Sequence, residues 1–114
     1  MQCNIESTDH EVFISALRAR RRIRLTFIAK DDGTARTRTC APFDFGPPRR
    51  IRDGRDRYHA WDYEGDPGPH PVMLLPEQIV RIEALDDLFD PAEFVTWNLV
   101  QSPWIYARDW GGHS

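Results

Sequence analysis

Residues 57–63 read Arg57-Tyr58-His59-Ala60-Trp61-Asp62-Tyr63, and the chain continues, after a turn rich in Pro and Gly, with Val72-Met73-Leu74-Leu75 and Pro76-Glu77-Gln78-Ile79-Val80-Arg81-Ile82-Glu83-Ala84-Leu85. The two segments 72–75 and 76–85 both have the apolar pattern of a β-strand, and Pro76 lies at the boundary between them. Proline removes a donor from the hydrogen-bond ladder, so it is placed at a break between strands rather than inside a central one. Two apolar strands kinked apart at a proline are typical of a small β-barrel that turns a corner.

The first hairpin precedes this stretch. Ile23, Leu25, Phe27 and Ala29 alternate with their neighbours, which predicts a half-buried strand, and Asp31-Asp32-Gly33 supplies the turn. A two-residue turn would place Arg36 and Arg38 opposite Leu25 and Phe27. A three-residue turn with Gly33 in the left-handed conformation would put Thr37, Thr39, Ala41 and Phe43 there instead. Because burying two unpaired guanidinium groups is costly, the three-residue turn is favoured, and it predicts an arginine-lined outer face. Residues 46–56 then form a loop.

Two helix starts flank the strands. Thr8 and Glu11 form a capping box, and the helix that follows carries one apolar face, made of Val12, Phe13, Ala16 and Leu17. Asp90-Pro91-Ala92-Glu93 has the acidic cap and the first-turn proline of a second helix, expected over 91–97, which would bury Phe94 and Val95 with Trp97 at its end.

The C-terminal residues are too aromatic for a free end, so residues 104–110 are expected to dock back on the barrel. Trp104, which follows Pro103, is expected to anchor this tail, whereas Trp110 beside Gly111-Gly112 is expected to be half exposed. The fold prediction is therefore a mainly β single domain over 1–114: a five-stranded SH3/Sm-like barrel with its core at about 22–86, an N-terminal helix, a short C-terminal helix and a docked tail.

Composition fits a soluble globular domain, and charge is unevenly distributed. The 114 residues carry a net charge of −3, yet residues 1–57 have a balance of +5 and residues 58–114 one of −8. Such asymmetry suggests a basic face for anions or nucleic acid opposed by an acidic one, although the preference for Arg over Lys also fits codon composition. Cys3 and Cys40 are too few for a disulfide framework, no apolar run approaches the roughly 20 residues of a membrane span, and the start is no signal peptide, so a cytoplasmic location is expected.

With these elements placed, the chain resembles a WYL domain, the Sm-like SH3-type barrel common in bacterial transcriptional regulators. The resemblance covers about residues 12–90. It rests on Ala16-Leu17-Arg18-Ala19-Arg20 at the entry from helix to strand, on Arg38 four residues before Pro42, on Tyr58 in its strand, and on Gln78-Ile79-Val80-Arg81-Ile82-Glu83.

The resemblance implies a ligand-binding, non-enzymatic regulatory module. The triplet that names the family would fall on Arg57-Tyr58-His59, where the Tyr is kept, and Arg38 matches the basic ligand-contact pattern. The family's basic positions on the late strand would fall near Leu75 and Gln78, which are uncharged. In the family these positions are thought to bind nucleotides or nucleic acid and to relay occupancy to a DNA-binding module. Since no room for a helix-turn-helix exists before residue 22, a stand-alone regulatory barrel is expected.

Catalytic and metal chemistry find little support in the sequence. The histidines and cysteines lack the spacing of a zinc site, and no cofactor motif is present. His59 beside Tyr58 could act as a general base, but no partnered nucleophile or Gly-rich loop accompanies it. Asp86, Asp87 and Asp90 fit a solvated surface and a helix cap. A non-enzymatic protein without metal or cofactor is expected.

The combination of aromatic and arginine residues predicts a binding face. Small barrels hold single strands by stacking bases on aromatic rings while arginines contact phosphates. The candidate ligand-binding residues are Arg36, Arg38, Arg57, Tyr58 and His59, and the predicted ligand is a nucleotide or single-stranded nucleic acid. The competing interpretation places Tyr58 in the core and the arginines on a solvated rim. The alternative function is a protein-interaction or homo-oligomerisation module, such as a homodimer, whose contacts would be made by Trp97, Trp104, Tyr106 and Trp110. Under either function no membrane partner is expected.

Overall fold

The computed structural model describes residues 8–65, 67–97, 99 and 102–114. It contains one α-helix, α1 (Asp9–Ala19), and five strands, β1 (Arg21–Ile28), β2 (Ala35–Gly46), β3 (Arg57–Asp62), β4 (His70–Leu74) and β5 (Ile79–Leu88). Three short 3-10 turns, η1 (Pro76–Gln78), η2 (Pro91–Glu93) and η3 (Gly111–His113), follow the later strands. Among the described residues, no helix has both the length and the apolar character needed to cross a membrane.

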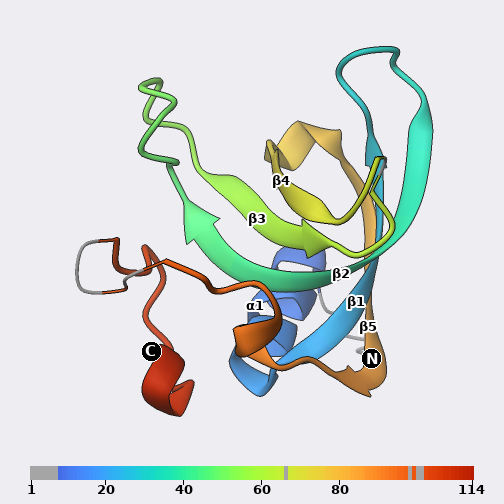
Figure 1. Ribbon diagram of the computed structural model, residues 1–114. Helices are drawn as coiled ribbons and strands as arrows, with labels where there is room; N and C mark the ends of the chain where they lie inside the picture. The colour runs from blue at the N-terminus through green and yellow to red at the C-terminus, as the bar shows by residue number, and fades with distance from the viewer. Residues whose placement is uncertain (1–7, 66, 98, 100–101) are drawn as a thin grey trace, which may run out of the picture.

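The five strands form one antiparallel sheet in the order β4-β3-β2-β1-β5, which confirms the mainly β prediction. β2 is long and bends strongly through the centre of the sheet (Figure 1). The sheet is not closed, because β4 and β5 are its two ends and no ladder joins them among the described residues. The break at Pro76 is confirmed: Leu75 and η1 separate β4 from β5.

Helix α1 begins at the predicted capping box. Thr8 Oγ1 accepts a 3.1 Å hydrogen bond from Glu11 N, and Glu11 Oε1 accepts one of 3.1 Å from Thr8 N. The bond from the Thr8 backbone holds the pKa of Glu11 below its usual value. Phe13, Ala16 and Leu17 are buried, and the helix ends where Arg20 adopts a left-handed conformation.

The predicted register of the first hairpin is wrong. Leu25 pairs with Arg38 and Phe27 with Arg36, so both arginines lie on the same side of the sheet as the buried residues of β1. The backbone pairing continues to Ala29 and Thr34, which leaves four residues in the turn, with Gly33 left-handed as expected. A turn with an even number of residues places Arg36 and Arg38 opposite Phe27 and Leu25, which is the pairing that the predicted three-residue turn excluded.

The physical reason is that neither guanidinium is unpaired. Arg36 Nη2 lies 3.2 Å from Asp31 Oδ1 and 3.0 Å from Asp32 Oδ2, both within the turn itself. The hydrogen bonds from Thr34 and Arg36 hold the pKa of Asp32 at about 2. Arg38 lies beside the buried Asp62, at 3.7 Å. Arg36 and Arg38 therefore do not join Arg24 on the outer face, where Thr26 and Thr37 share a hydrogen bond instead.

The second predicted helix is only one turn long. Asp90 Oδ1 accepts from Ala92 N at 3.0 Å, which confirms the cap, but η2 ends at Glu93. Phe94 N and Val95 N both donate to the carbonyl of Pro91. Phe94 then turns into the core against Phe89, so the chain leaves the helical path there. A cap sets where a helix starts, but burial of Phe94 decides where this one stops.

The sheet has two covered faces. The face that we call the helix face carries Phe45, Tyr58 and Leu74 and packs on α1, where Phe13 contacts the Tyr58 ring. The opposite face, the tail face, carries His59 and Trp61, since successive strand residues point to opposite sides. The C-terminal residues cover part of the tail face. Their docking confirms the expected packing of the tail. The prediction that Trp110 is half exposed was wrong, because Trp110 is 2% exposed and donates from Nε1 to the Leu17 carbonyl at 2.8 Å.

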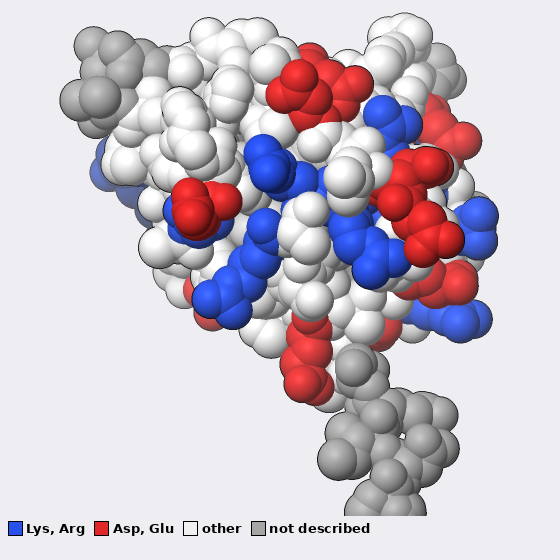
Figure 2. Space-filling view, turned by 90° about the horizontal axis from the view of Figure 1, so that it is seen from below, with Lys and Arg blue, Asp and Glu red and all other residues white. Residues whose placement is uncertain are grey.

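The uneven charge of the chain is largely used internally. Ion pairs join arginines of the first half to acids of the second half: Arg21 to Asp86, Arg22 to Glu93, Arg38 to Asp62 and Arg55 to Glu77. The view in Figure 2 shows basic and acidic side chains interspersed on that side of the molecule. On the face drawn there, the two signs of charge are thus not separated into the basic and acidic faces that the sequence suggested.

Candidate ligand groove

A β-bulge in β2 shapes the tail face. Pro42 pairs with Ala60 and Asp44 pairs with His59, so Phe43 is an extra residue in the ladder. A bulge turns two adjacent side chains towards the same side, and here Phe43 and Asp44 both point into one groove. Proline fits this position because an irregular ladder does not require its missing donor.

The groove has a volume of about 690 Å³. Its walls come from β2, β3, β4, the loop after β2 and the C-terminal tail. Aromatic rings dominate the lining, and two arginines belong to it: Phe43, Asp44, Pro48, Arg49, Arg50, Ile51, His59, Trp61, Pro71, Met73, Phe94, Trp97, Ser102, Pro103, Trp104 and Ile105. An apolar cavity with few polar groups is the usual form of a ligand site.

Exposed apolar side chains concentrate in this groove. Ile51, Met73, Trp97 and Ile105 are between 38% and 42% exposed, and all four line it. Large apolar side chains that share one exposed hollow mark an interaction site more often than scattered ones do. Trp97 packs edge-on against Trp104 at a centroid distance of 5.5 Å, so part of its ring is fixed while the rest faces solvent.

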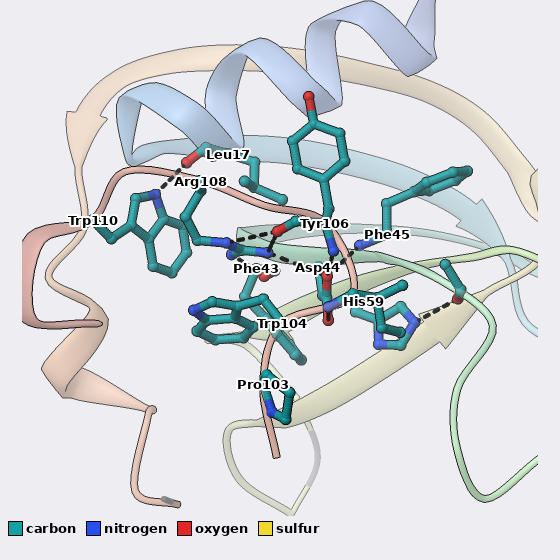
Figure 3. Close-up of polar contacts among 12 residues, drawn as sticks. Leu17, Phe43, Asp44, Phe45, His59, Pro103, Trp104, Tyr106, Arg108 and Trp110 are labelled. Carbon is teal, nitrogen blue, oxygen red and sulfur yellow. Dashed lines mark hydrogen bonds and ion pairs between the residues drawn. The ribbon is translucent and has the colours of Figure 1, made fainter. Parts of the chain in front are cut away.

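The tail forms one wall of the groove and is held by a buried ion pair (Figure 3). Asp44 accepts backbone hydrogen bonds from Ile105 N at 3.1 Å and from Tyr106 N at 2.9 Å, and it lies 3.2 Å from Arg108 Nη2. The Arg108 side chain is fully buried. Its guanidinium lies 4.0 Å from the ring centre of Trp104 and 4.5 Å from that of Trp110.

Arg108 also donates to the backbone carbonyls of Phe43 and Tyr106, so its donors reach both the bulge and the tail. Burial lowers the pKa of Arg108 to about 10, and Asp44 opposes that shift by favouring the charged form. The bulge, the carboxylate and the tail therefore act as one structural unit, and the position of the groove wall depends on it.

The loop over residues 47–56 forms the opposite wall. Arg57 binds Asp53 with two hydrogen bonds, Nη1 to Oδ1 at 3.0 Å and Nη2 to Oδ2 at 2.9 Å. The hydrogen bonds from Arg57 and from the Arg55 backbone lower the pKa of Asp53 well below its usual range. Arg49 Nη2 donates to the Pro103 carbonyl at 3.1 Å and so links this loop to the tail. Arg50 is exposed at the groove and makes no ion pair within the described part of the chain.

The structure separates the five predicted site residues. Tyr58 is 7% exposed on the helix face, where its hydroxyl shares a 3.0 Å hydrogen bond with His10 Nδ1. Burial raises the pKa of Tyr58. Arg38 lies on the same face beside Asp62. His59 lies on the tail face as part of the groove floor and is 4% exposed. The Tyr58 and His59 rings therefore do not form one exposed stacking platform.

Arg36 and Arg57 line a second cavity, of about 400 Å³, together with Lys30. Ile51 and Met73 line this cavity as well as the groove, so the two hollows share a wall. His59 in the groove and Arg36 and Arg57 in the second cavity therefore line two adjoining hollows. Arg38 and Tyr58 line neither of them.

Sequence reasoning missed most of the groove lining, above all Phe43, Trp61, Trp97 and Arg50. For Trp61 a signal was available: it lies two residues after His59 in the same strand and so shares its face. Phe43 points there only because of the bulge, which the sequence did not reveal. Trp97 and Trp104 were recognised as interface candidates but not placed beside His59.

Comparisons with protein-family models, curated proteins and solved structures found no match. No group of three or more His, Cys, Asp or Glu residues within 8–65, 67–97, 99 and 102–114 is arranged to hold a metal ion.

Proposed function

We propose that this chain is a non-enzymatic binding module that takes a nucleotide or a single-stranded nucleic acid in the aromatic groove. The observation that carries the proposal is the coincidence of exposed apolar side chains, tryptophan rings and Arg50 in one hollow. Stacking of a base on an aromatic ring contributes about 1–3 kcal/mol, and every base offers a face for it. A guanidinium at the mouth suits the attached phosphate.

The adjoining cavity extends this surface in the direction of a bound strand. Lys30 and Arg36 line it, and the Arg36 side chain is 34% exposed although it pairs with Asp31 and Asp32. A strand whose base occupies the groove would pass Ile51 and Met73 and bring its next phosphate to these cations. Phosphate contacts of this kind position a strand without reading its sequence.

The architecture supports a likeness to the small regulatory barrels of WYL domains. The strand order places β4 and β5 at opposite ends of the sheet, yet only residues 75–78 join them, so the two edges start close together. Together with the curvature of β2, this is the arrangement from which an SH3/Sm-like barrel is built (Figure 1). We propose that the chain shares the regulatory, ligand-sensing role of that family, with its ligand in the groove.

The direct test is fluorescence anisotropy with short labelled DNA and RNA strands at low salt. Trp97→Ala should weaken binding by about 5- to 100-fold, the equivalent of one lost stacking contact. The matched control is Leu88→Ala, which truncates an apolar side chain that is exposed on β5 outside the groove. Binding that is absent at tens of micromolar, or equal loss in both variants, would contradict the proposal.

The phosphate contact has its own test. Arg50→Gln should weaken binding and reduce the slope of log affinity against log salt, because one fewer counterion is released. Arg24→Gln removes the same charge from an exposed site on β1 away from the groove, and it should leave the slope unchanged. Equal slopes for both variants would show that only the overall charge matters.

A second candidate function, self-association, is favoured by two side chains on the edge strand β5. Val80 and Leu88 are 54% and 66% exposed there. The same strand carries Arg81, Glu83, Asp86 and Asp87, and charges on an edge strand oppose pairing with another copy. Light scattering separates the candidates: a concentration-dependent dimer that Leu88→Asp disrupts would favour association.

A further inference from the structure

The floor of the groove presents a hydrogen-bond acceptor that the protein itself does not use. His59 Nε2 lies 2.9 Å from the carbonyl oxygen of Gly46. A carbonyl oxygen only accepts, so Nε2 must carry the proton and donate it. In a neutral imidazole the other nitrogen, Nδ1, is then left with a lone pair. Gly46 therefore fixes the tautomer as well as the orientation of the ring.

Nδ1 has no hydrogen-bond partner among the described residues, although the His59 side chain belongs to a residue that is 96% buried (4% exposed). The ring is held from the side by Phe43, in an edge-to-face contact at 6.0 Å. The close-up shows it on the groove floor near Trp104 and Pro103 (Figure 3). A polar atom without a partner at the bottom of an apolar hollow is a specificity feature, because a ligand must satisfy it or leave it unpaired.

The other polar groups of the groove do not compete for this role. The Asp44 carboxylate is already occupied by the tail, through Ile105 N, Tyr106 N and Arg108. The guanidinium and indole groups of the lining are donors only, and the Ser102 hydroxyl belongs to an exposed residue of the tail rather than to the buried floor. His59 Nδ1 is thus the acceptor on the floor that remains open to a ligand within the described lining.

We infer that His59 is a specificity-determining residue that selects a planar ring bearing an N–H or NH₂ donor on its edge. The inference rests on the proposed function, since it assigns the base that stacks in the groove. The ring slides between the aromatic walls, its edge donates to His59 Nδ1, and its phosphate remains at the mouth near Arg50. A ring of the same shape without an edge donor would leave Nδ1 unpaired.

The test compares two single-stranded DNA oligomers of equal length, one of adenine and one of unsubstituted purine, which lacks the amino group and any other N–H donor. The measurement is fluorescence anisotropy of the labelled oligomers. We expect the adenine oligomer to bind about tenfold more tightly, as one buried hydrogen bond implies. His59→Phe keeps an aromatic ring but removes both ring nitrogens and so the acceptor, and the preference should disappear.

His70→Phe is the matched control, because His70 lies outside the groove and its variant should keep the preference. Equal binding of both oligomers to the wild-type chain would overturn the role of His59 while the proposed function stands. Binding of neither oligomer would overturn both. If His59→Phe does not fold, thymine and N3-methylthymine oligomers on the wild-type chain repeat the comparison, since methylation removes the only donor of that base.

Discussion

The two faces of the sheet are covered in physically different ways. On the helix face, α1 contributes Phe13 and Leu17, which are fully buried among apolar neighbours. On the tail face, the cover is a segment without ladder hydrogen bonds to the sheet in its described part, and its anchor is the ion pair of Arg108 and Asp44 between two indole rings. The first cover is close apolar packing, whereas the second leaves a groove lined by exposed apolar side chains.

The difference shows how one sheet can be closed by packing on one side and keep an open groove on the other. Apolar packing is non-directional and closes any gap that it can fill. A polar anchor holds a segment at a defined place and leaves the space beside it open, because its energy depends on a few directed contacts. The predictions below test this division, beginning with the largest effect.

Phe13→Ala should cause the largest loss of stability. Truncating a buried aromatic side chain costs about 3–5 kcal/mol, through lost burial and the cavity that remains. Urea unfolding followed by tryptophan fluorescence would measure it. The molecules that stay folded should bind oligonucleotide with unchanged affinity, because α1 does not reach the groove. A loss of affinity without a loss of stability would break the division between the two faces.

Arg108→Met should cost somewhat less, about 3 kcal/mol, at the lower end of the range for removing one partner of a buried pair. Asp44 would lose its counter-ion but keep the hydrogen bonds from Ile105 N and Tyr106 N. Unlike Phe13→Ala, this change should also weaken binding in the folded molecules, because the tail wall is displaced.

The double variant Asp44→Asn with Arg108→Met should be more stable than the sum of the single losses predicts, as expected for two groups that interact directly. Thermal and urea unfolding of the four proteins complete the cycle. Strict additivity would mean that the pair does not anchor the tail.

Arg38→Ala should lower stability by about 1 kcal/mol and leave ligand binding intact. The change removes the cation beside the Asp62 carboxylate, which keeps its hydrogen bond from Glu64 N. Because Arg38 lies on the helix face, anisotropy titrations should match wild type. A large loss of affinity would move the ligand to that face and restore Arg38 as a contact residue, as the family resemblance implied.

Acid should loosen the loop wall of the groove. The pKa of Asp53 is lowered by its hydrogen bonds with Arg57 and Arg55, and that of Glu77 by Arg55. A lowered pKa in the folded state means that the carboxylate stabilises the fold above its unfolded pKa, about 4, and that this contribution is lost as the pH falls further. Hydrogen exchange at pH 3 and pH 6, corrected for intrinsic rates, should show reduced protection in residues 47–56 but not in β1. Unchanged protection of the loop would contradict this.

Local patterns predicted much of the fold. The capping box of α1, the alternation in β1 and the break at Pro76 are short-range features, and the structure confirms them. The register of the first hairpin was wrong because the argument counted only the cost of burying arginines. Asp31 and Asp32 in the turn, and Asp62 on the neighbouring strand β3, offset that cost. The contribution of Asp62 cannot be seen without knowing which strands pair.

The sequence predicted an arginine and aromatic surface made of five residues, and the structure brings only some of them together. It places His59 in the groove and Arg36 and Arg57 in the adjoining cavity. Tyr58 lies elsewhere because neighbours in a strand point to opposite faces. Arg38 lies on the same face as Arg36 but further along β2, beside Asp62 and outside the cavity.

By itself the sequence determined the elements of this protein, because caps, alternation and proline breaks act between residues that are close along the chain. Tertiary structure alone decided the groove. Its floor depends on a bulge that turns Phe43 beside His59, and its wall depends on Arg108 meeting Asp44 across 64 positions of the chain. Contacts of that range are set by how the sheet curves and pairs, and no local pattern in the chain encodes them.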